Sequence, residues 1–321
     1  MAQSKIEIPK SKIMRGVLLV NMGGPDSPEE LKDFLSRMFK DPAILPFAKP
    51  IRNLLSFIIS RTRYKKSWKK YQLIGGTPLV KSTVKTAKEL QKVLGESFNV
   101  RYAFSYSSPD LKRSLNDFKM MGVSDITVVP LYPQSSYTTT SSVTADLNNV
   151  TKSDSFFNLT VVEEFYKHPG FIAFWIHLIT KHVGDHGIKD PTLVFSAHSI
   201  PEYHVLNGDT YPTGIINCAA LIASRLGFHY EAAFQSGMKR GKWIGPDVRE
   251  HLNTLAEEGI DDLVLIPISF VHENLETRYD LDYELIPYAK DVLGLTNVTR
   301  VQLPEADPLL VGMLADIVLK S

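Results

Sequence analysis

The chain has a single cysteine among its 321 residues and almost no net charge. One thiol, Cys218, excludes an internal disulfide framework and cannot by itself hold a zinc ion or an iron–sulfur cluster. Cys218 lies in the apolar run 215–226, where we expect a small buried helix residue rather than a reactive thiol. The 36 basic and 35 acidic residues nearly cancel, which leaves no overall field that would draw the chain onto nucleic acid.

Long apolar runs are also missing. The longest candidate, residues 54–59, is far too short for a membrane-spanning helix. Residues 1–15 are polar and alternately charged, so they lack the apolar segment of a secretory signal. We therefore expect a cytoplasmic globular protein, and 44% hydrophobic residues are enough for one large two-lobed unit.

Short apolar runs alternate with helical patterns along the chain. Residues 16–22 are typical of a strand buried on both faces, and the turn 23–25 closes it. Ser27 and Glu30 then form a capping box for a helix that has Pro28 at its first position. Similar strand signals recur at residues 99–104, 126–131, 192–196 and 263–268. This alternation predicts an α/β protein whose parallel sheets are covered by helices.

A polar stretch at residues 148–157 separates two groups of strands, so we place the boundary between two lobes after residue 150. In doubly wound sheets, ligands bind beyond the carboxyl ends of the strands, and functional residues should therefore follow the strands. The glycine pairs at 23–24 and 75–76 match no phosphate-binding pattern and are interpreted as tight turns.

His198 comes directly after the apolar strand 192–195. A histidine there would project from the carboxyl edge of a sheet. A loop histidine is more often structural, however, and no metal-binding partner lies at a fixed spacing near it. The segment also lacks the G-x-S-x-G elbow of a hydrolase. Taken alone, His198 leaves both a structural and a functional role open.

Five carboxylates crowd residues 273–284, just after a predicted strand. If this segment is helical, Glu276, Asp280 and Glu284 lie on one face, where like charges repel and weaken the helix. Some other feature should offset that repulsion. The segment is either a solvated acidic face or a path for a cation or for protons.

Three other segments suggest a ligand. Residues 130–140 follow a strand with many hydroxyl groups, which suit the polar edge of a ligand, and residues 234–246 offer an aromatic wall. A wide, flat aromatic ligand would suit both. Residues 44–59 are rich in apolar side chains and are followed by basic ones at 61–70. That pattern indicates either a core helix with a basic turn or a lip that lies on a membrane surface.

Together these motifs resemble the ferrochelatase family, over residues 16–319. The matching segments, in family order, are LVNMGGP (19–25), GGTPL (75–79), LYPQ (131–134), SAHSIP (196–201), GDTYP (208–212), QS (235–236), WIGP (243–246) and LET (275–277). The resemblance implies two Rossmann-like lobes, 1–150 and 151–304, around a porphyrin cleft. It also implies a membrane-facing lip at about 44–60 and a C-terminal helix within 305–321 that crosses back to the first lobe.

The resemblance also implies roles for individual residues. It places His198 and Glu276 against the porphyrin nitrogens as catalytic residues, and it adds Asp280 and Glu284 to them as candidate metal ligands in an acidic row. The substrate-binding residues that we expect from the matching motifs are Met22, Tyr106, Tyr132, Gln134, Ser196 and Trp243.

At four positions the chain departs from the residues common in the family. Asn274 stands where a histidine is common, Glu273 where aspartate is usual, Ser105 where some members have arginine, and Ser135 where tyrosine is frequent. These positions concern the metal route and the contacts to the porphyrin propionates.

The implied activity is insertion of Fe²⁺ into protoporphyrin IX with release of two protons, to form protohaem. Fe²⁺ is then a substrate, no redox cofactor is needed, and no iron–sulfur cluster is expected. The expected partners are the porphyrin, Fe²⁺ and a membrane surface contacted peripherally, with no nucleic acid, and the oligomeric state stays open. The alternatives are a coproporphyrin ferrochelatase or another class II tetrapyrrole chelatase, and, outside enzymes, a two-lobed tetrapyrrole-binding protein. Met22 and the short C-terminus look like the protoporphyrin-using bacterial branch.

Overall fold

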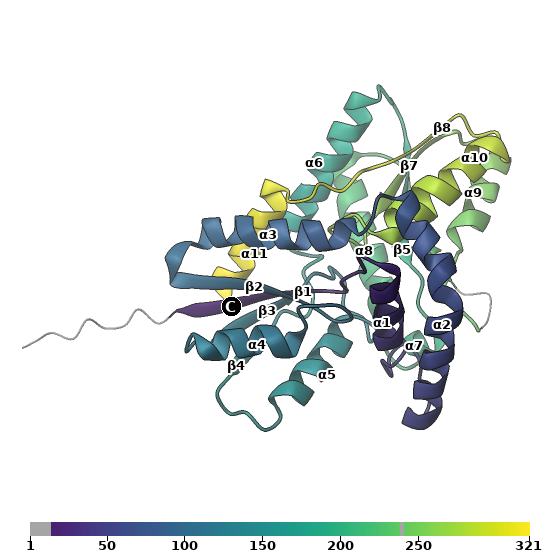
Figure 1. The fold of residues 1–321 in the computed structure, drawn as a ribbon. Coiled ribbons are helices and arrows are strands. Elements are labelled where there is room, and N and C mark those ends of the chain that lie inside the picture. The colour runs from purple at the N-terminus through teal and green to yellow at the C-terminus, as the bar shows by residue number, and fades with distance from the viewer. Residues whose placement is uncertain (1–13, 238–240) are drawn as a thin grey trace, which may run out of the picture.

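The computed structural model describes residues 14–237 and 241–321 and contains two parallel four-stranded sheets (Figure 1). The first has the order β2-β1-β3-β4, with β1 (Arg15–Asn21), β2 (Phe98–Phe104), β3 (Asp125–Pro130) and β4 (Asn158–Val161). The second has the order β6-β5-β7-β8, with β5 (Thr192–His198), β6 (Tyr230–Gln235), β7 (Asp262–Pro267) and β8 (Asn297–Arg300). The two lobes thus repeat one topology, and the predicted fold class is confirmed. The expectation for residues 1–15 falls largely outside the described residues.

Helices flank both sheets. Their bounds are α1 (Pro28–Met38), α2 (Lys49–Leu73), α3 (Pro78–Leu94), α4 (Leu111–Met120), α5 (Thr140–Thr151), α6 (Pro169–Asp185), α7 (Glu202–Leu206), α8 (Tyr211–Leu226), α9 (Val248–Glu257), α10 (Ile286–Asp291) and α11 (Pro308–Lys320). A π-helix (Glu276–Leu285) runs directly into α10. None of the described helices is long and apolar enough to cross a membrane.

The lobe boundary predicted after residue 150 is wrong, because the first sheet continues beyond it. β4 pairs in parallel with β3, with Asp125 opposite Asn158 and Val128 opposite Val161. β4 is a four-residue edge strand whose residues alternate between exposed and half-buried. It therefore lacks the continuous apolar run by which strands buried on both faces are identified.

One apolar core joins the two lobes. It includes Val17 and Leu19 of β1, Phe195 of β5, and the buried faces of α3, α6, α8 and α11. α11 packs against α3, which covers the first sheet, and against α6 (Figure 1). Cys218 is fully buried in α8 within this core, as its apolar surroundings predict.

The turn after β1 sets the position of α1. Gly23 has φ +90°, and a Cβ there would collide with the side chain of Ser107, so both conformation and space require glycine. Ser27 then caps α1 by accepting the N–H of Glu30 at 3.1 Å. The Glu30 carboxylate accepts the N–H of Asp26, one residue before the cap, at 2.9 Å. The predicted helix start is confirmed.

Candidate active site

The carboxyl ends of the two sheets carry most of the predicted site residues. Met22 follows β1, and its carbonyl accepts the N–H of Tyr106, which follows β2, at 3.1 Å. Tyr132 follows β3, His198 ends β5, and the π-helix comes after β7. The carboxyl ends of parallel strands lie at one edge of a sheet, so these residues lie at the edge of each lobe where ligands bind in such folds.

A cavity of about 120 Å³ lies where α1, the end of α2, the start of α3 and the start of the π-helix meet. Met22 and Glu276, which come from different lobes, both line it, and so does Tyr71. The apolar residues of its wall are Leu31, Phe34, Leu35, Met38, Leu79 and Leu275. The structure thus brings two residues predicted from separate motifs to one cavity.

Burial in this wall raises the pKa of Glu276, because a charged carboxylate loses hydration there. His198 partly opposes the rise, while Asp280 adds to it as a neighbouring negative charge. The hydroxyl of Tyr71 has a raised pKa as well, through burial and then through Glu276. Glu276 is therefore a carboxyl group that can hold a proton more readily than an ordinary surface glutamate.

The side chain of His198 is oriented by its own loop. Its Nδ1 lies 2.6 Å from the carbonyl oxygen of Ser199, and a carbonyl can only accept, so Nδ1 carries the proton. In the neutral ring this assignment leaves Nε2 with a free lone pair. The hydroxyl of Tyr211 donates to the carbonyl of His198 at 3.0 Å, which fixes the end of the strand. His198 can therefore accept a proton or bind a metal through Nε2.

The acidic row does not stand alone. Lys70 of α2 places its Nζ 3.4 Å from Asp280 Oδ1 and 3.8 Å from Glu284 Oε1. The second oxygen of Asp280 accepts the hydroxyl of Ser236 at 2.7 Å. Among the described residues no lysine or arginine forms an ion pair with Glu276. The charge repulsion expected from the sequence is thus offset for the outer two carboxylates by a lysine from the other lobe.

The other two carboxylates of the segment serve the fold. The guanidinium of Arg300 binds Asp282 through two hydrogen bonds of 2.6 Å and Glu273 through one of 3.0 Å. Glu273 also accepts the N–H of Leu303 at 2.7 Å. Arg300 and Glu273 are both buried, so this is a paired internal network that ties the π-helix to β8.

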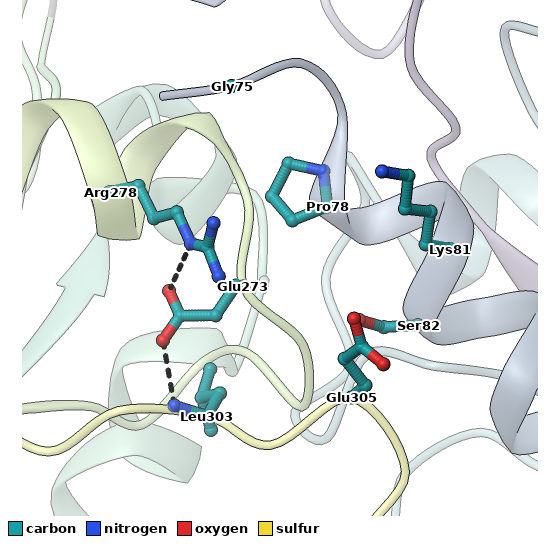
Figure 2. Close-up of a pocket in the computed structure, with 8 residues that line it drawn as sticks. All are labelled: Gly75, Pro78, Lys81, Ser82, Glu273, Arg278, Leu303 and Glu305. Carbon is teal, nitrogen blue, oxygen red and sulfur yellow. Dashed lines mark hydrogen bonds and ion pairs between the residues drawn. The ribbon is translucent and has the colours of Figure 1, made fainter. Parts of the chain in front are cut away.

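A second, polar cavity of about 90 Å³ lies beside this network, and Pro78 lines both cavities (Figure 2). Arg278 and Glu273 face one another there, 3.9 Å apart, and Glu305 closes one side. Glu305 also pairs with Lys85 at 2.8 Å, so three of the charged side chains in its lining, Glu273, Arg278 and Glu305, have partners within the protein. We interpret this cavity as part of the support of the π-helix. Nowhere in the described ranges do three or more His, Cys, Asp or Glu side chains converge as a metal cluster.

Three of the predicted substrate-binding residues are buried inside the protein. Ser196 is 0% exposed and donates to Gln235 Oε1 at 2.6 Å, so it supports the end of β5 and offers no surface to a ligand. Gln134 is buried between the lobes, with Nε2 3.5 Å from the carbonyl of Ile268. Tyr106 is buried too, and its hydroxyl donates to Asp41 at 2.8 Å. For Ser196 this burial contradicts the prediction of a substrate contact.

The remaining two predicted residues are half-buried. Tyr132 has a raised pKa because of burial, which a hydrogen bond with Ser105 partly offsets. Trp243 forms an isolated antiparallel bridge with Pro201, three residues beyond His198, and lies against Gly237. Both therefore border the segments that follow the strands, as expected from their motifs.

A buried histidine near the site gave no signal in the sequence. His272 lies between the lobes, with Nε2 2.9 Å from Thr86 Oγ1 and Nδ1 3.5 Å from Thr83 Oγ1, both on α3. Thr83 in turn accepts the amide of Asn21 at 3.0 Å. The partners lie about 190 residues from His272 in the chain, so no local pattern could indicate them. The ion pairs of Lys70 and Arg300 with the acidic segment could not be predicted for the same reason.

Comparison with known proteins decides the family. The ferrochelatase family's sequence profile matches residues 14–321. The chain belongs to the ferrochelatase family. This is a family of enzymes that insert a metal ion into a tetrapyrrole. A ferrochelatase of Aquifex aeolicus is 35% identical over 308 residues, covering 95% of this chain and 98% of that protein. A ferrochelatase of a Sulfurihydrogenibium species is 32% identical over 336 residues, and the alignment covers 97% of this chain and 99% of that protein.

Solved structures of chelatases share the ferrochelatase fold seen here. SirB from Bacillus subtilis with Fe³⁺ aligns with a TM-score of 0.58 at 11% identity, covering 96% of this chain and 95% of that one. CbiX, described as the terminal enzyme of sirohaem biosynthesis in denitrifying bacteria, aligns with a TM-score of 0.51 at 14% identity, covering 96% and 99%. At these identities the likeness concerns the fold alone.

Proposed function

We propose that this ferrochelatase family member inserts Fe²⁺ into protoporphyrin IX and forms protohaem. The observation that carries the proposal is that Glu276, whose pKa is raised, lines one cavity with Met22 and lies close enough to His198 to be affected by it electrostatically. Insertion replaces two pyrrole N–H protons by one Fe²⁺, so two protons must leave for each metal bound. A base together with a carboxyl group whose pKa is raised suits this balance.

The two residues divide or share these tasks. His198 Nε2 can accept a pyrrole proton or bind iron, and a Glu276 carboxylate can do either. Asp280 and Glu284 continue outward from Glu276 along the π-helix and would carry Fe²⁺ in or protons out. The iron stays ferrous throughout, so the reaction requires no redox cofactor. The chain's single cysteine cannot supply the thiolates of an iron–sulfur cluster.

Substrate entry requires the cavity to widen. Its volume of about 120 Å³ is below the ~300 to 1,000 Å³ of ordinary small-molecule sites, and a porphyrin is a large planar ligand. We expect the wall formed by α1 and α2 to be the part that moves, because these two helices pack against each other outside the two sheets (Figure 1). We propose that these helices separate from the π-helix when the macrocycle binds.

The same helix pair supports a peripheral contact with a membrane. Phe47, Ile51, Leu54 and Ile58 are each about half exposed and recur at spacings of three and four along α2 and its approach. Basic residues follow in the next turns of α2. An exposed apolar stripe beside cations is typical of an interfacial helix, and a porphyrin partitions into lipid. We therefore propose a cytoplasmic enzyme that docks reversibly on a membrane surface.

Anaerobic incubation with Fe²⁺ and either protoporphyrin or coproporphyrin tests the activity, followed through the porphyrin absorption bands. We expect turnover with protoporphyrin, and with Zn²⁺ as a convenient second metal, because nitrogen and oxygen ligands accept both ions. Faster turnover with coproporphyrin would transfer the assignment to that substrate. Tight porphyrin binding without turnover would favour the non-enzymatic alternative, a tetrapyrrole-binding protein.

A further inference from the structure

The acidic row is occupied by a cation that the protein itself supplies. Lys70 lies 210 residues before Asp280 in the chain, yet its Nζ reaches both outer carboxylates of the row. The same ammonium lies 4.1 Å from the centre of the Tyr279 ring, which adds a cation–π contact. Lys70 is only 28% exposed, whereas its neighbour Lys69 is exposed to solvent. Of these two adjacent lysines, only Lys70 pairs with the acidic row.

A metal ion that uses the row must displace this ammonium. Asp280 has one oxygen hydrogen-bonded to Ser236, and its other oxygen faces Lys70, so neither is free of a partner. Glu284 shares the same lysine. A divalent ion that binds these carboxylates must take the place of the Lys70 ammonium, which already interacts with both of them. The metal ion and the ammonium therefore compete for the same carboxylates. Partly exposed ion pairs of this kind change binding by a factor of up to about five.

We propose that Lys70 is a built-in competitor for the metal, which sets the concentration of divalent cation at which the acidic row fills. This inference rests on the proposed function, in which Asp280 and Glu284 carry the metal. Lys70 touches neither substrate nor the reacting atoms, so it is a specificity-determining residue that acts through the row. Removing its charge should make metal enter more readily. Lys70 also lowers the pKa of Glu276, but it is the smallest of the influences on that group, so the chemistry there should change little.

The test compares Lys70→Gln, Lys70→Arg and the matched control Lys69→Gln, which removes the same charge one residue away. Zn²⁺ insertion at low ionic strength gives KM for the metal and kcat for each variant. We expect Lys70→Gln to lower KM by about threefold to fivefold with kcat within about twofold of the parent. Lys70→Arg, which keeps the charge, and Lys69→Gln should both stay within about twofold of the parent KM.

A second measurement separates this inference from the proposed function. Calorimetric titration of the porphyrin-free protein with Zn²⁺ reports on the row even if no variant turns over. Lys70→Gln should bind Zn²⁺ about threefold to fivefold more tightly, and adding Asp280→Asn should abolish that gain. Equal effects of Lys70→Gln and Lys69→Gln, or weaker Zn²⁺ binding by Lys70→Gln, would overturn the competitor role. Tighter binding without insertion by any variant would refute the enzymatic function alone.

Discussion

His272 should make the stability of this protein depend on pH in a measurable way. Burial between the lobes lowers the pKa of its imidazole from 6.5 to about 3. The folded protein therefore keeps the ring neutral, while the unfolded chain takes up a proton below about pH 6.5. Because the unfolded state then binds more protons, the free energy of unfolding decreases as the pH falls. The stability that depends on a neutral His272 is fully present above pH 6.5 and is lost progressively as the pH falls towards 3.

The size of the effect follows from the two pKa values. Each pH unit in this window costs about 1.4 kcal/mol of unfolding free energy, so about 2 kcal/mol is lost between pH 7.5 and pH 5. His272→Gln removes the titrating group and keeps a side chain that can hydrogen-bond Thr86. Its lost contacts should lower stability by roughly 1 to 3 kcal/mol at every pH, which leaves the pH dependence as the diagnostic quantity.

Urea unfolding of the parent and of His272→Gln at pH 7.5 and pH 5 provides the measurement. His182, whose pKa is lowered to about 4, also contributes to the parent's pH dependence, but it is common to both proteins and cancels in their difference. The exposed His177 on α6 gives a matched control, since His177→Gln should keep the parent's pH dependence. If the parent and His272→Gln lose equal stability over this range, the neutral buried histidine is refuted.

The active site and the α2 surface give further expectations. His198→Ala should remove most of the metallation rate and leave porphyrin binding largely intact, because apolar walls supply the binding and the histidine the chemistry. Glu276→Gln should resemble it, whereas Asp280→Ala should keep a partial rate, because a row of several carboxylates tolerates one loss. Replacing Phe57 and Ile58, which are 52% and 46% exposed, by serine should reduce co-sedimentation with anionic liposomes.

Controls make these results decisive. Metallation rates measured against metal concentration for all three site variants test the hierarchy. A parent-like rate in His198→Ala would exclude that histidine, and an Asp280→Ala defect as large as the other two would remove the division of labour. For the membrane contact, Val93→Ser changes an apolar residue on α3 that is 61% exposed. If the α2 variant and Val93→Ser sediment with lipid to the same extent, the stripe on α2 is not an interfacial surface.

Local sequence patterns were sufficient for the frame of the fold. The runs that became β1, β5 and β7 are buried on both faces, so their central residues are mostly apolar and stand out in the sequence. The cap at Ser27 depends on contacts within four residues, which is why the start of α1 could be predicted. His198 could be placed at a strand end for the same reason, because the strand that precedes it is local.

Only the tertiary structure decided what surrounds those elements. The edge strand β4 carries only exposed and half-buried residues and so lacks the apolar run of a buried strand, which misplaced the lobe boundary. The burial of Ser196, and the pairing of the acidic segment with Lys70 and Arg300, depend on side chains from distant parts of the chain. Sequence spacing shows that like charges are crowded, but the cations that neutralise them are brought there by folding. The contacts that adjust this site are therefore long-range, and no local pattern in the chain encodes them.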